Sequence, residues 1–238
     1  MANLYSLQFN GSSQYGIILS SCIDPRNNYT IELWVKLNAE IASGTYEFLR
    51  LQNNTAKHVV YLMYEYNSGT RRLNFKQDRW LLAGASAYYT VNLGTTSWHH
   101  LAFQKSGTTL QIYFDGTAVG STGTVDNNTG DTTTNNDVSF GAAEAIGGSA
   151  ISNYANAKID ELRIWSVART AQEIVDNKDK ELTGSESNLV EYIKFYNGSG
   201  STATATTGTN GTLTNNPVWS TDVPFIGTAG GIFFHNFL

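Results

Sequence analysis

The sequence predicts an all-β domain, either a sandwich or a barrel, and three observations support this prediction. Alternating apolar and polar residues recur along the chain, which is typical of strands with one face in a core. Turn signals such as Asn10-Gly11 and Asp115-Gly116 separate the alternating segments. Hydrophobic residues make up 41% of the 238 residues and charged residues 15%, which provides a core and argues against a disordered chain.

The strands are predicted from residue patterns along the chain. Thr30–Leu37 and Thr109–Phe114 place apolar residues on one face and mostly polar ones on the other. Val59–Tyr66 is apolar on both parities, which indicates a central strand covered on both sides. We expect further strands, in chain order, at Leu4–Phe9, Tyr15–Leu19, Arg71–Gln77, Ala87–Leu93, Trp98–Lys105, Asp137–Gly141, Ala157–Trp165 and Leu189–Tyr196.

One short helix and two irregular stretches complete the prediction. Thr170 and Glu173 match the T-x-x-E capping box, so a helix of about two turns begins there and covers an end of the sandwich. Gly120–Asn136 is rich in Gly, Ser, Thr and Asn and is expected to be a long exposed loop. Ser199–Thr214 has a similar composition and is also expected to be irregular.

Bulk composition excludes several functions. The net charge is −5 and no basic run exceeds two residues, so nucleic-acid binding is not expected. The single Cys22 excludes an intrachain disulfide and a cysteine-based zinc cluster. No apolar stretch is long enough to span a membrane, and the residues after Met1 do not resemble a signal peptide. We therefore expect a protein that reaches the outside by another route, such as virion assembly, unless a leader was removed.

Several motifs resemble the laminin G-like (concanavalin A-like, pentraxin-related) family. They occur in the family's order from Leu4 to Trp219, and each is weak alone. The segments that carry the resemblance are Phe9-Asn10-Gly11-Ser12, Tyr29-Thr30-Ile31-Glu32-Leu33-Trp34-Val35-Lys36, Trp98-His99-His100-Leu101-Ala102, Leu110-Gln111-Ile112-Tyr113-Phe114-Asp115-Gly116, Ile159-Asp160-Glu161-Leu162-Arg163-Ile164-Trp165 and, as closing strands, Leu189-Val190-Glu191-Tyr192, Gly211-Thr212-Leu213 and Pro217-Val218-Trp219. The resemblance implies a two-sheet antiparallel jelly-roll sandwich over residues 1–222, followed by an apolar tail or last strand at 223–238. It also implies carbohydrate or protein-surface binding, often with calcium.

Asp160 is the candidate metal ligand. It shares the strand parity of Leu162 and Ile164, so we expect it to point toward the core, where a carboxylate needs a hydrogen-bond, ionic or metal partner. Calcium suits such a hard oxygen donor. The resemblance implies that this aspartate holds a structural Ca²⁺ with carbonyls of the N-terminal turn, here at Asn10 and Gly11. The alternative is that Asp160 caps backbone N–H groups without metal.

Two further groups are candidate ligand-binding residues. Trp80, Tyr88 and Tyr89, together with Tyr64 and Tyr66 of the predicted central strand, are candidates for an aromatic platform on which sugar rings stack, although tyrosines are also ordinary core residues. Asp126 and Asp131 supply oxygen ligands in the predicted long loop, for a second calcium or a ligand. Their spacing does not match an EF-hand, and a solvated loop is the alternative.

The functional hypotheses follow from these candidates. The first is a non-catalytic, lectin-like adhesion module that binds surface glycan or a protein partner, outside the cell or on a virion. The second is a structural virion protein of a phage, a head-decoration or tail-adhesin component. The third and weakest is a glycosidase, because the paired-acid motif E-x-D-x-x-E of sandwich glycosidases is missing from the sequence.

The apolar C-terminus is a candidate interface. Phe233, Phe234 and Phe237 lie beyond the family pattern, and exposed apolar residues of this kind usually mark a contact with a partner or a second copy. The alternative is a last strand that folds back on the domain.

Overall fold

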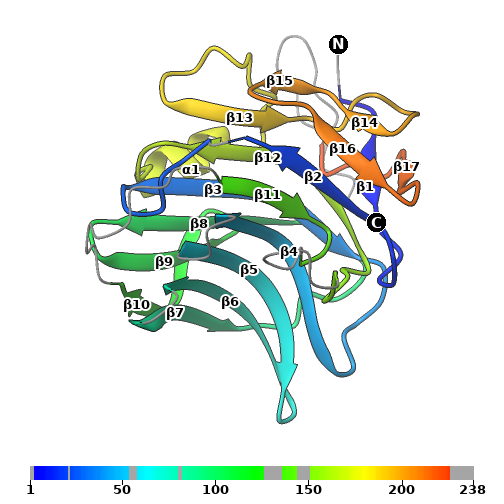
Figure 1. Ribbon diagram of the computed structural model, residues 1–238. Coiled ribbons are helices and arrows are strands. Elements are labelled where there is room, and N and C mark those ends of the chain that lie inside the picture. The colour runs from blue at the N-terminus through cyan, green and yellow to red at the C-terminus, as the bar shows by residue number, and fades with distance from the viewer. Residues whose placement is uncertain are drawn as a thin grey trace.

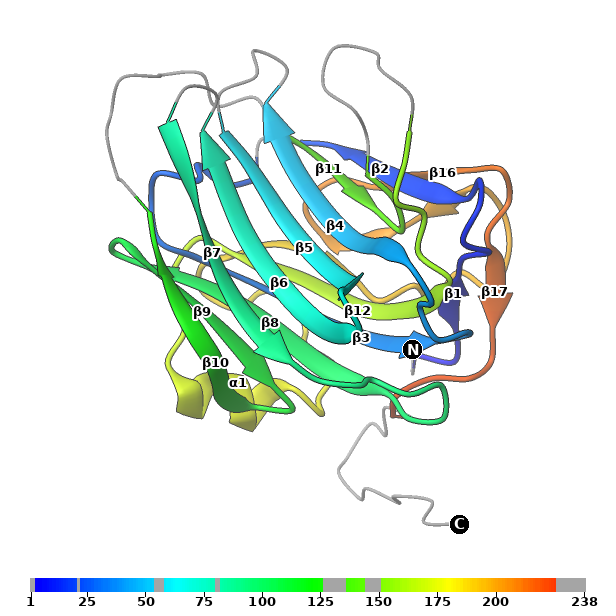
Figure 2. The ribbon, with the colours of Figure 1, turned by 90° about the horizontal axis from the view of Figure 1, so that it is seen from below.

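The computed structural model describes residues 3–20, 22–53, 58–79, 82–125, 136–143 and 151–225. Within these ranges the regular elements are strands and one short helix. All strand pairs are antiparallel, and they form two sheets packed face to face (Figures 1 and 2). The predicted jelly-roll sandwich with one helix is therefore confirmed.

The first sheet, here called sheet A, runs in the order β10-β9-β8-β3-β12-β1-β17, with β13 also paired to β12 and β15 paired to β13. Its strands are β1 (Ser6–Gln8), β3 (Tyr29–Leu37), β8 (His99–Ser106), β9 (Thr109–Phe114), β10 (Thr117–Thr124), β12 (Ala157–Trp165), β13 (Leu189–Ile193), β15 (Ala205–Thr207) and β17 (Val218–Ser220). Sheet A thus brings the N-terminal strand and the last described strand side by side.

The second sheet, sheet B, runs in the order β14-β16-β2-β11-β4-β5-β6-β7. Its strands are β2 (Tyr15–Leu19), β4 (Gly44–Asn53), β5 (His58–Asn67), β6 (Thr70–Arg79), β7 (Leu82–Thr90), β11 (Asn136–Phe140), β14 (Thr202–Ala203) and β16 (Gly211–Thr214). Strands β4 to β7 are long and curved, and they form one side of the molecule in Figure 2.

One continuous core fills the space between the sheets. The four apolar residues on the inner face of β3 are at most 1% exposed, as their alternation predicted. Aromatic rings interlock across the sheets: the ring of Phe75 in β6 lies 6.3 Å from Tyr29 and 5.7 Å from Phe103 of sheet A. Such offset and edge-to-face contacts are the favoured aromatic geometries. The strand alternation read from the sequence is therefore the pattern of a two-layer core.

The helix α1 (Ala171–Asn177) packs on the outer face of sheet A and not over an end of the sandwich (Figure 2). Its N-cap is Thr170, and the predicted capping box with Glu173 is present. The only buried residue of the helix, Ile174, contacts Ala102 of β8 and Tyr113 of β9. Because α1 and the chain after it cover this face, outward residues of β3 such as Glu32 are buried as well.

The structure corrects the prediction that Gly120–Asn136 is entirely loop. Residues 120–124 continue strand β10, which runs along β7 at the edge of sheet B. A β-carbon on Gly120 would lie 2.0 Å from the Tyr88 carbonyl oxygen, and one on Gly123 would lie 2.7 Å from the Ser86 backbone. The glycines that favoured a loop in the sequence instead allow two backbones to approach closely.

Strand β4 was not predicted. The stretch Ser199–Thr214, expected from its composition to be irregular, contains three short strands, of which β16 lies on the closing-strand motif Gly211-Thr212-Leu213. In β4 the register shifts between Glu47 and Leu49, and both Phe48 and Leu49 are fully buried. A β-bulge of this kind breaks the period of two, which is why the alternation is hard to detect there.

Candidate functional site

The outer face of sheet B is the candidate functional site. Directly opposed residues of antiparallel strands point to the same side of a sheet, so the registers define rows across β4, β5, β6 and β7. One row contains Glu47, Met63, Asn74 and Tyr88, the next contains Arg50, Tyr61, Lys76 and Ser86, and Glu65 faces Arg72 beside the first row. Four neighbouring strands thus gather aromatic, cationic, acidic and amide side chains on one surface.

Tyr61 lies at the centre of this face with a cation near its ring on two sides. The Arg50 guanidinium lies 4.7 Å from the ring centroid and the Lys76 ammonium 5.3 Å from it. Both cations are also ion-paired, Arg50 to Glu47 at 2.6 Å and Lys76 to Asp78 at 2.5 Å. Partial burial raises the pKa of the Tyr61 phenol. At neutral pH the ring therefore remains a neutral hydroxyl-bearing surface.

A second aromatic unit follows along the face. The Arg72 guanidinium lies 4.3 Å from the centroid of the Tyr88 ring and pairs with Glu65 at 2.5 Å. Asn74 donates from Nδ2 to the same Glu65 carboxylate at 3.4 Å. Because each described cation of the two units has an acidic partner, the face holds many charges without a strong excess of either sign.

Several polar groups of this face are buried. Glu47 is fully buried, bonded to Arg50 and to Asn153 Nδ2 at 3.3 Å. Burial raises the pKa of Glu47, and the Arg50 and Asn153 contacts partly offset that rise. Two amide oxygens, Asn74 Oδ1 and Gln52 Oε1, are buried and have no hydrogen-bond donor among the described residues. An unpaired buried acceptor costs about 1–3 kcal/mol, and because both oxygens are shielded from the surface, a ligand on this face does not contact them.

The predicted ligand residues are only partly brought together. Tyr88 lies on the outer face of sheet B, whereas its neighbour Tyr89 points inward and its ring lies 5.6 Å from Phe114. Tyr64 is fully buried in the core. Trp80, Asp126 and Asp131 lie outside the described residues. Tyr61, which sequence reasoning missed, is identified by its register opposite Arg50 and Lys76.

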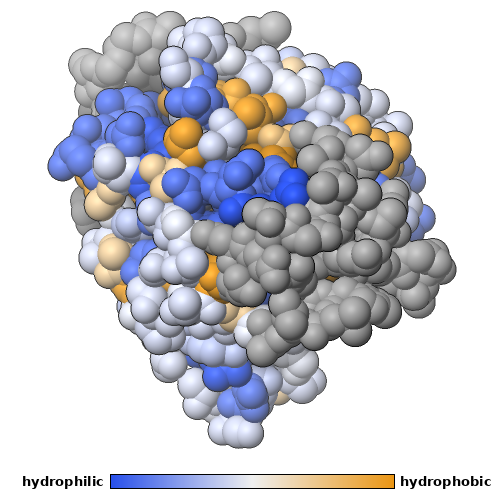
Figure 3. Space-filling view, turned by 60° about the vertical axis from the view of Figure 1, so that its left-hand side comes forward, coloured by the Kyte–Doolittle hydropathy of each residue, from blue (hydrophilic) through white to orange (hydrophobic). Residues whose placement is uncertain are grey.

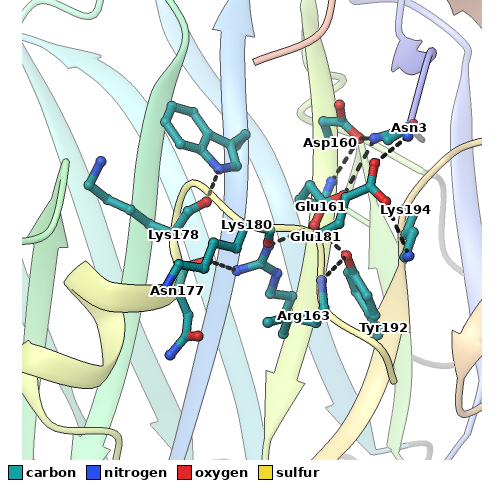
Figure 4. A network of polar contacts seen from close by, with 12 residues as sticks. Asn3, Asp160, Glu161, Arg163, Asn177, Lys178, Lys180, Glu181, Tyr192 and Lys194 are labelled. Carbon is teal, nitrogen blue, oxygen red and sulfur yellow. Dashed lines mark hydrogen bonds and ion pairs between the residues drawn. The ribbon is translucent and has the colours of Figure 1, made fainter. Parts of the chain in front are cut away.

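The structure places Asp160 in a polar network on the outer face of sheet A (Figure 4). The register of β12 shifts after Asp160, and Glu161 adopts a left-handed φ of 52°. Asp160 therefore faces outward opposite Trp34, while Leu162 and Ile164 face the core, so its predicted direction is wrong. The carboxylate is nevertheless fully buried, because the chain beyond α1 covers it.

The network links β12 to the N-terminus and to the chain after α1 (Figure 4). Asp160 Oδ1 accepts from Asn3 Nδ2 at 2.8 Å and from the Glu161 N–H at 2.9 Å. Glu161 accepts from Arg163 at 2.7 Å and from the Tyr192 hydroxyl at 2.5 Å. Arg163 also donates to the carbonyl oxygens of Asn177 and Lys180. These bonds satisfy the helix C-terminus, a structural role for charges buried beneath it.

Asn10, Gly11 and Asp160 do not form one coordination shell. Asn10 Oδ1 accepts from the N–H groups of Ser12 and Ser13. The Gly11 N–H donates to the carbonyl oxygen of Ala155, which lies before β12 begins and so precedes Asp160 along the chain. Asp160 Oδ2 is buried and has no hydrogen-bond partner among the described residues. Among the described residues, no group of three or more His, Cys, Asp or Glu side chains is placed to hold a metal ion.

The remaining candidates concern the C-terminal tail and the outer surface. Phe233, Phe234 and Phe237 lie outside the described residues, and the described part of the tail ends at Phe225, whose ring lies 6.0 Å from that of Trp34. Figure 3 shows the side at the left of Figure 1, where the coloured surface is mostly hydrophilic with small hydrophobic groups between. No helix of the described chain is long and apolar enough to cross a membrane.

Comparison with known proteins supports a specific family. The model of the concanavalin A-like lectin/glucanases superfamily matches residues 10–175. A sequence search of curated proteins finds no match. Among solved structures, a putative carbohydrate binding protein from Bacteroides ovatus is similar, with a TM-score of 0.62, 18% identity, and coverage of 97% of this chain and 63% of that one.

Two further structures share the fold. A heptameric SAP-like pentraxin from Limulus polyphemus has a TM-score of 0.54 and 13% identity, over 72% of this chain and 80% of that one. Domains LG4-5 of the mouse laminin alpha1 chain give a TM-score of 0.50 and 15% identity, over 70% of this chain and 43% of theirs. At these identities the likeness concerns the fold alone.

Proposed function

This chain belongs to the concanavalin A-like lectin/glucanases superfamily, and from that premise we propose that it is a non-catalytic module that binds glycan on the outer face of sheet B. The observation that carries the proposal is the convergence of Tyr61 and Tyr88 with ion-paired arginines on four adjacent strands. The Bacteroides ovatus structure with the same fold is described as a putative carbohydrate binding protein, which supports the same ligand class.

The chemistry of the face suits a sugar. A sugar presents apolar C–H faces and hydroxyl groups that both donate and accept hydrogen bonds, which matches aromatic rings flanked by charged and amide groups. The arginines are held by Glu47 and Glu65 and so are preoriented, which lowers the entropy that binding must overcome.

The absence of catalysis is part of the proposal. A glycosidase needs two carboxyl groups on opposite sides of the scissile bond, one of them protonated. On this face Glu47 and Glu65 are each bound to an arginine, an arrangement that serves to position charges. Glu47 has a raised pKa and is the residue that an enzymatic function would use as acid. Hydrolysis of any bound glycan would therefore contradict this part of the proposal.

A glycan array followed by titration of the best ligand tests the proposal. We expect Tyr61→Ala to weaken binding about tenfold, because the ring and the cations around it lose their positions; tenfold corresponds to ~1.4 kcal/mol. Tyr5→Ala is the matched control, since Tyr5 is half-buried beside Gly198, away from this face. No binding to any glycan, or equal losses in both variants, would refute the site. Reducing-sugar release measured on the same ligand tests catalysis.

Calcium binding is a separate proposal. The fold family implies a structural ion at Asp160, and its unpartnered Oδ2 supports a cation there, although Asn10 and Gly11 do not reach it. A bound ion would raise the melting temperature by mass action. If the melting curves measured with calcium and with EDTA coincide, calcium binding is contradicted.

The setting of the module is also proposed. A glycan-binding sandwich of this family suits the cell exterior or a virion surface, and adhesion through a phage tail or head protein remains the alternative function. Phage or cell-surface localisation by immunogold electron microscopy, with an antibody against this chain, would separate the two settings.

A further inference from the structure

The cations of the candidate face are neutralised by carboxylates of the same face. Among the outward residues of β4 to β7 that the structure describes, each arginine or lysine has an acidic partner on its own side of the sheet. The pairs are Arg50 with Glu47, Lys76 with Asp78 and Arg72 with Glu65, at 2.6, 2.5 and 2.5 Å. Their formal charges cancel, so this part of the face attracts neither anions nor cations over a distance.

One of these pairs presents a donor beside an acceptor at the surface. The side chains of Arg72 and Glu65 are 28% and 16% exposed, and the two residues lie directly opposite each other on β6 and β5. Within the described chain Arg72 donates through Nε alone, and Glu65 accepts through Oε1 alone, from Arg72 and from Asn74. The Nη groups of Arg72 and Oε2 of Glu65 are not buried. They are therefore accessible to a ligand.

A hydroxyl group fits this donor and acceptor. It accepts from an N–H group while it donates to a carboxylate oxygen, whereas a carboxylate or sulfate only accepts. An acidic sugar would also bring its negative charge beside the Glu65 carboxylate, and like charges at short range repel each other. An arginine without an acidic partner has the opposite preference, because its planar guanidinium matches the paired oxygens of an acidic group.

The other two carboxylates of the face are less suited to select a ligand. Glu47 is fully buried, holds Arg50 with both oxygens and is bonded to Asn153 as well. Asp78 pairs with a lysine, whose ammonium is a point charge without the planar geometry that recognises an acidic group. Glu65 is thus the carboxylate that both reaches the surface and neutralises an arginine there.

We infer that Glu65 determines the specificity of the candidate face, which admits neutral glycans and excludes those that carry uronate or sulfate groups. The inference rests on the glycan site proposed above. Glu65 cancels the charge of Arg72 and also fixes its guanidinium, which lies 4.3 Å from the centroid of the Tyr88 ring. A sugar hydroxyl bridges an Nη group of Arg72 and Oε2 of Glu65 in this arrangement.

Binding of the full chain and of Glu65→Gln to paired neutral and acidic glycans tests this inference. The probes are short glucose, galactose and mannose oligosaccharides, each arrayed with its sulfated and its uronate counterpart. We expect the natural chain to bind a neutral member and not its acidic counterparts. Glu65→Gln should bind the acidic counterparts about tenfold more tightly than the natural chain does, because the amide leaves the Arg72 charge uncompensated. The gain should fall as sodium chloride is added.

Glu40→Gln is the matched control. Glu40 pairs with Arg71 at 3.1 Å, and the Arg71 guanidinium lies 5.3 Å from the centroid of the Tyr66 ring, an arrangement of the same kind. Because consecutive residues of a strand point to opposite faces, Arg71 lies on the other side of sheet B from Arg72. The control therefore removes the same charge away from the candidate face, and acidic glycan binding should not change.

The outcomes separate this inference from the proposed function. Acidic glycans that bind the natural chain as tightly as their neutral parents, no gain in Glu65→Gln, or equal gains in Glu65→Gln and Glu40→Gln would overturn the inference. A gain that persists when Arg72→Gln is added to Glu65→Gln would overturn it as well. If the natural chain binds no neutral glycan while Glu65→Gln gains the acidic ones, the glycan function is refuted but the exclusion of acidic ligands by Glu65 is supported. Circular dichroism melting curves verify that each variant is folded.

Discussion

A single unusual backbone conformation determines where the adjacent carboxylates of Asp160 and Glu161 lie. The left-handed φ of Glu161 and the register shift beside it put both side chains beneath the chain that follows α1. Burial and the neighbouring Glu161 charge raise the pKa of Asp160 well above its usual value, while Asn3 and the Glu161 N–H oppose the rise. Holding this strained bulge costs on the order of 1–3 kcal/mol. The network of Arg163 and Tyr192 bonds offsets that cost.

The raised pKa of Asp160 makes stability depend on pH. The folded chain holds this proton more tightly than the unfolded chain, whose carboxyl titrates near 3.8. The group's contribution to stability is therefore full below that value and is lost as pH rises toward the folded pKa. We predict that Asp160→Asn, which has no charge to bury, is more stable than the natural chain at pH 7, by about 1 kcal/mol.

Urea unfolding of both proteins in EDTA, from pH 4 to pH 7, measures this effect. The difference in unfolding free energy should shrink toward pH 4, where the natural aspartate is protonated. An Asp160→Asn variant that is less stable at pH 7 would instead indicate that the carboxylate is ionised and stabilised, as bound calcium would make it. Repeating the series with calcium in place of EDTA distinguishes that case.

At the scale of elements, local sequence signals determined the helix more fully than the strands. The Thr170 hydroxyl accepts from the Glu173 N–H at 3.2 Å, and the Glu173 carboxylate accepts from the Thr170 N–H at 2.7 Å. These contacts span three residues, so they are visible in the sequence. Strand β4 has no equivalent signal, because its bulge at Phe48 places two consecutive apolar residues in the core.

The capping box is testable by substitution. We predict that Thr170→Ala lowers the free energy of unfolding by about 1 kcal/mol, because an N–H group at the start of α1 loses its acceptor. Gln172→Ala, on the exposed side of the same helix, is the control and should cost a few tenths of a kcal/mol. Chemical denaturation measures both. Equal losses would mean that the box contributes nothing beyond helix propensity.

At the scale of the whole molecule, the two sheets share one core. The same cluster contains Leu33 and Ile159 of sheet A together with Leu62 and Val138 of sheet B. Phe140 of β11 lies between Phe9 and Phe195, with ring centroids 6.1 Å and 5.6 Å away. Neither sheet therefore buries its apolar face without the other.

We predict that the chain unfolds in a single cooperative transition. The reason is that losing either sheet exposes the apolar face of its partner. Calorimetry and far-ultraviolet circular dichroism should give the same midpoint, and the calorimetric enthalpy should equal the van't Hoff value. Two resolved transitions would mean that sheet A with α1 and sheet B are separate folding units.

The sequence alone determined the all-β class, the positions of most strands, the capped helix and the family resemblance, because alternation, turns and caps act over a few residues. Only the tertiary structure decided which side chains meet. Tyr61, Arg50 and Lys76 became neighbours through the registers of β4, β5 and β6, and Asp160 left the core side through one bulge. Register and bulges depend on contacts between distant segments, and a shift of one residue reverses the face of every side chain that follows.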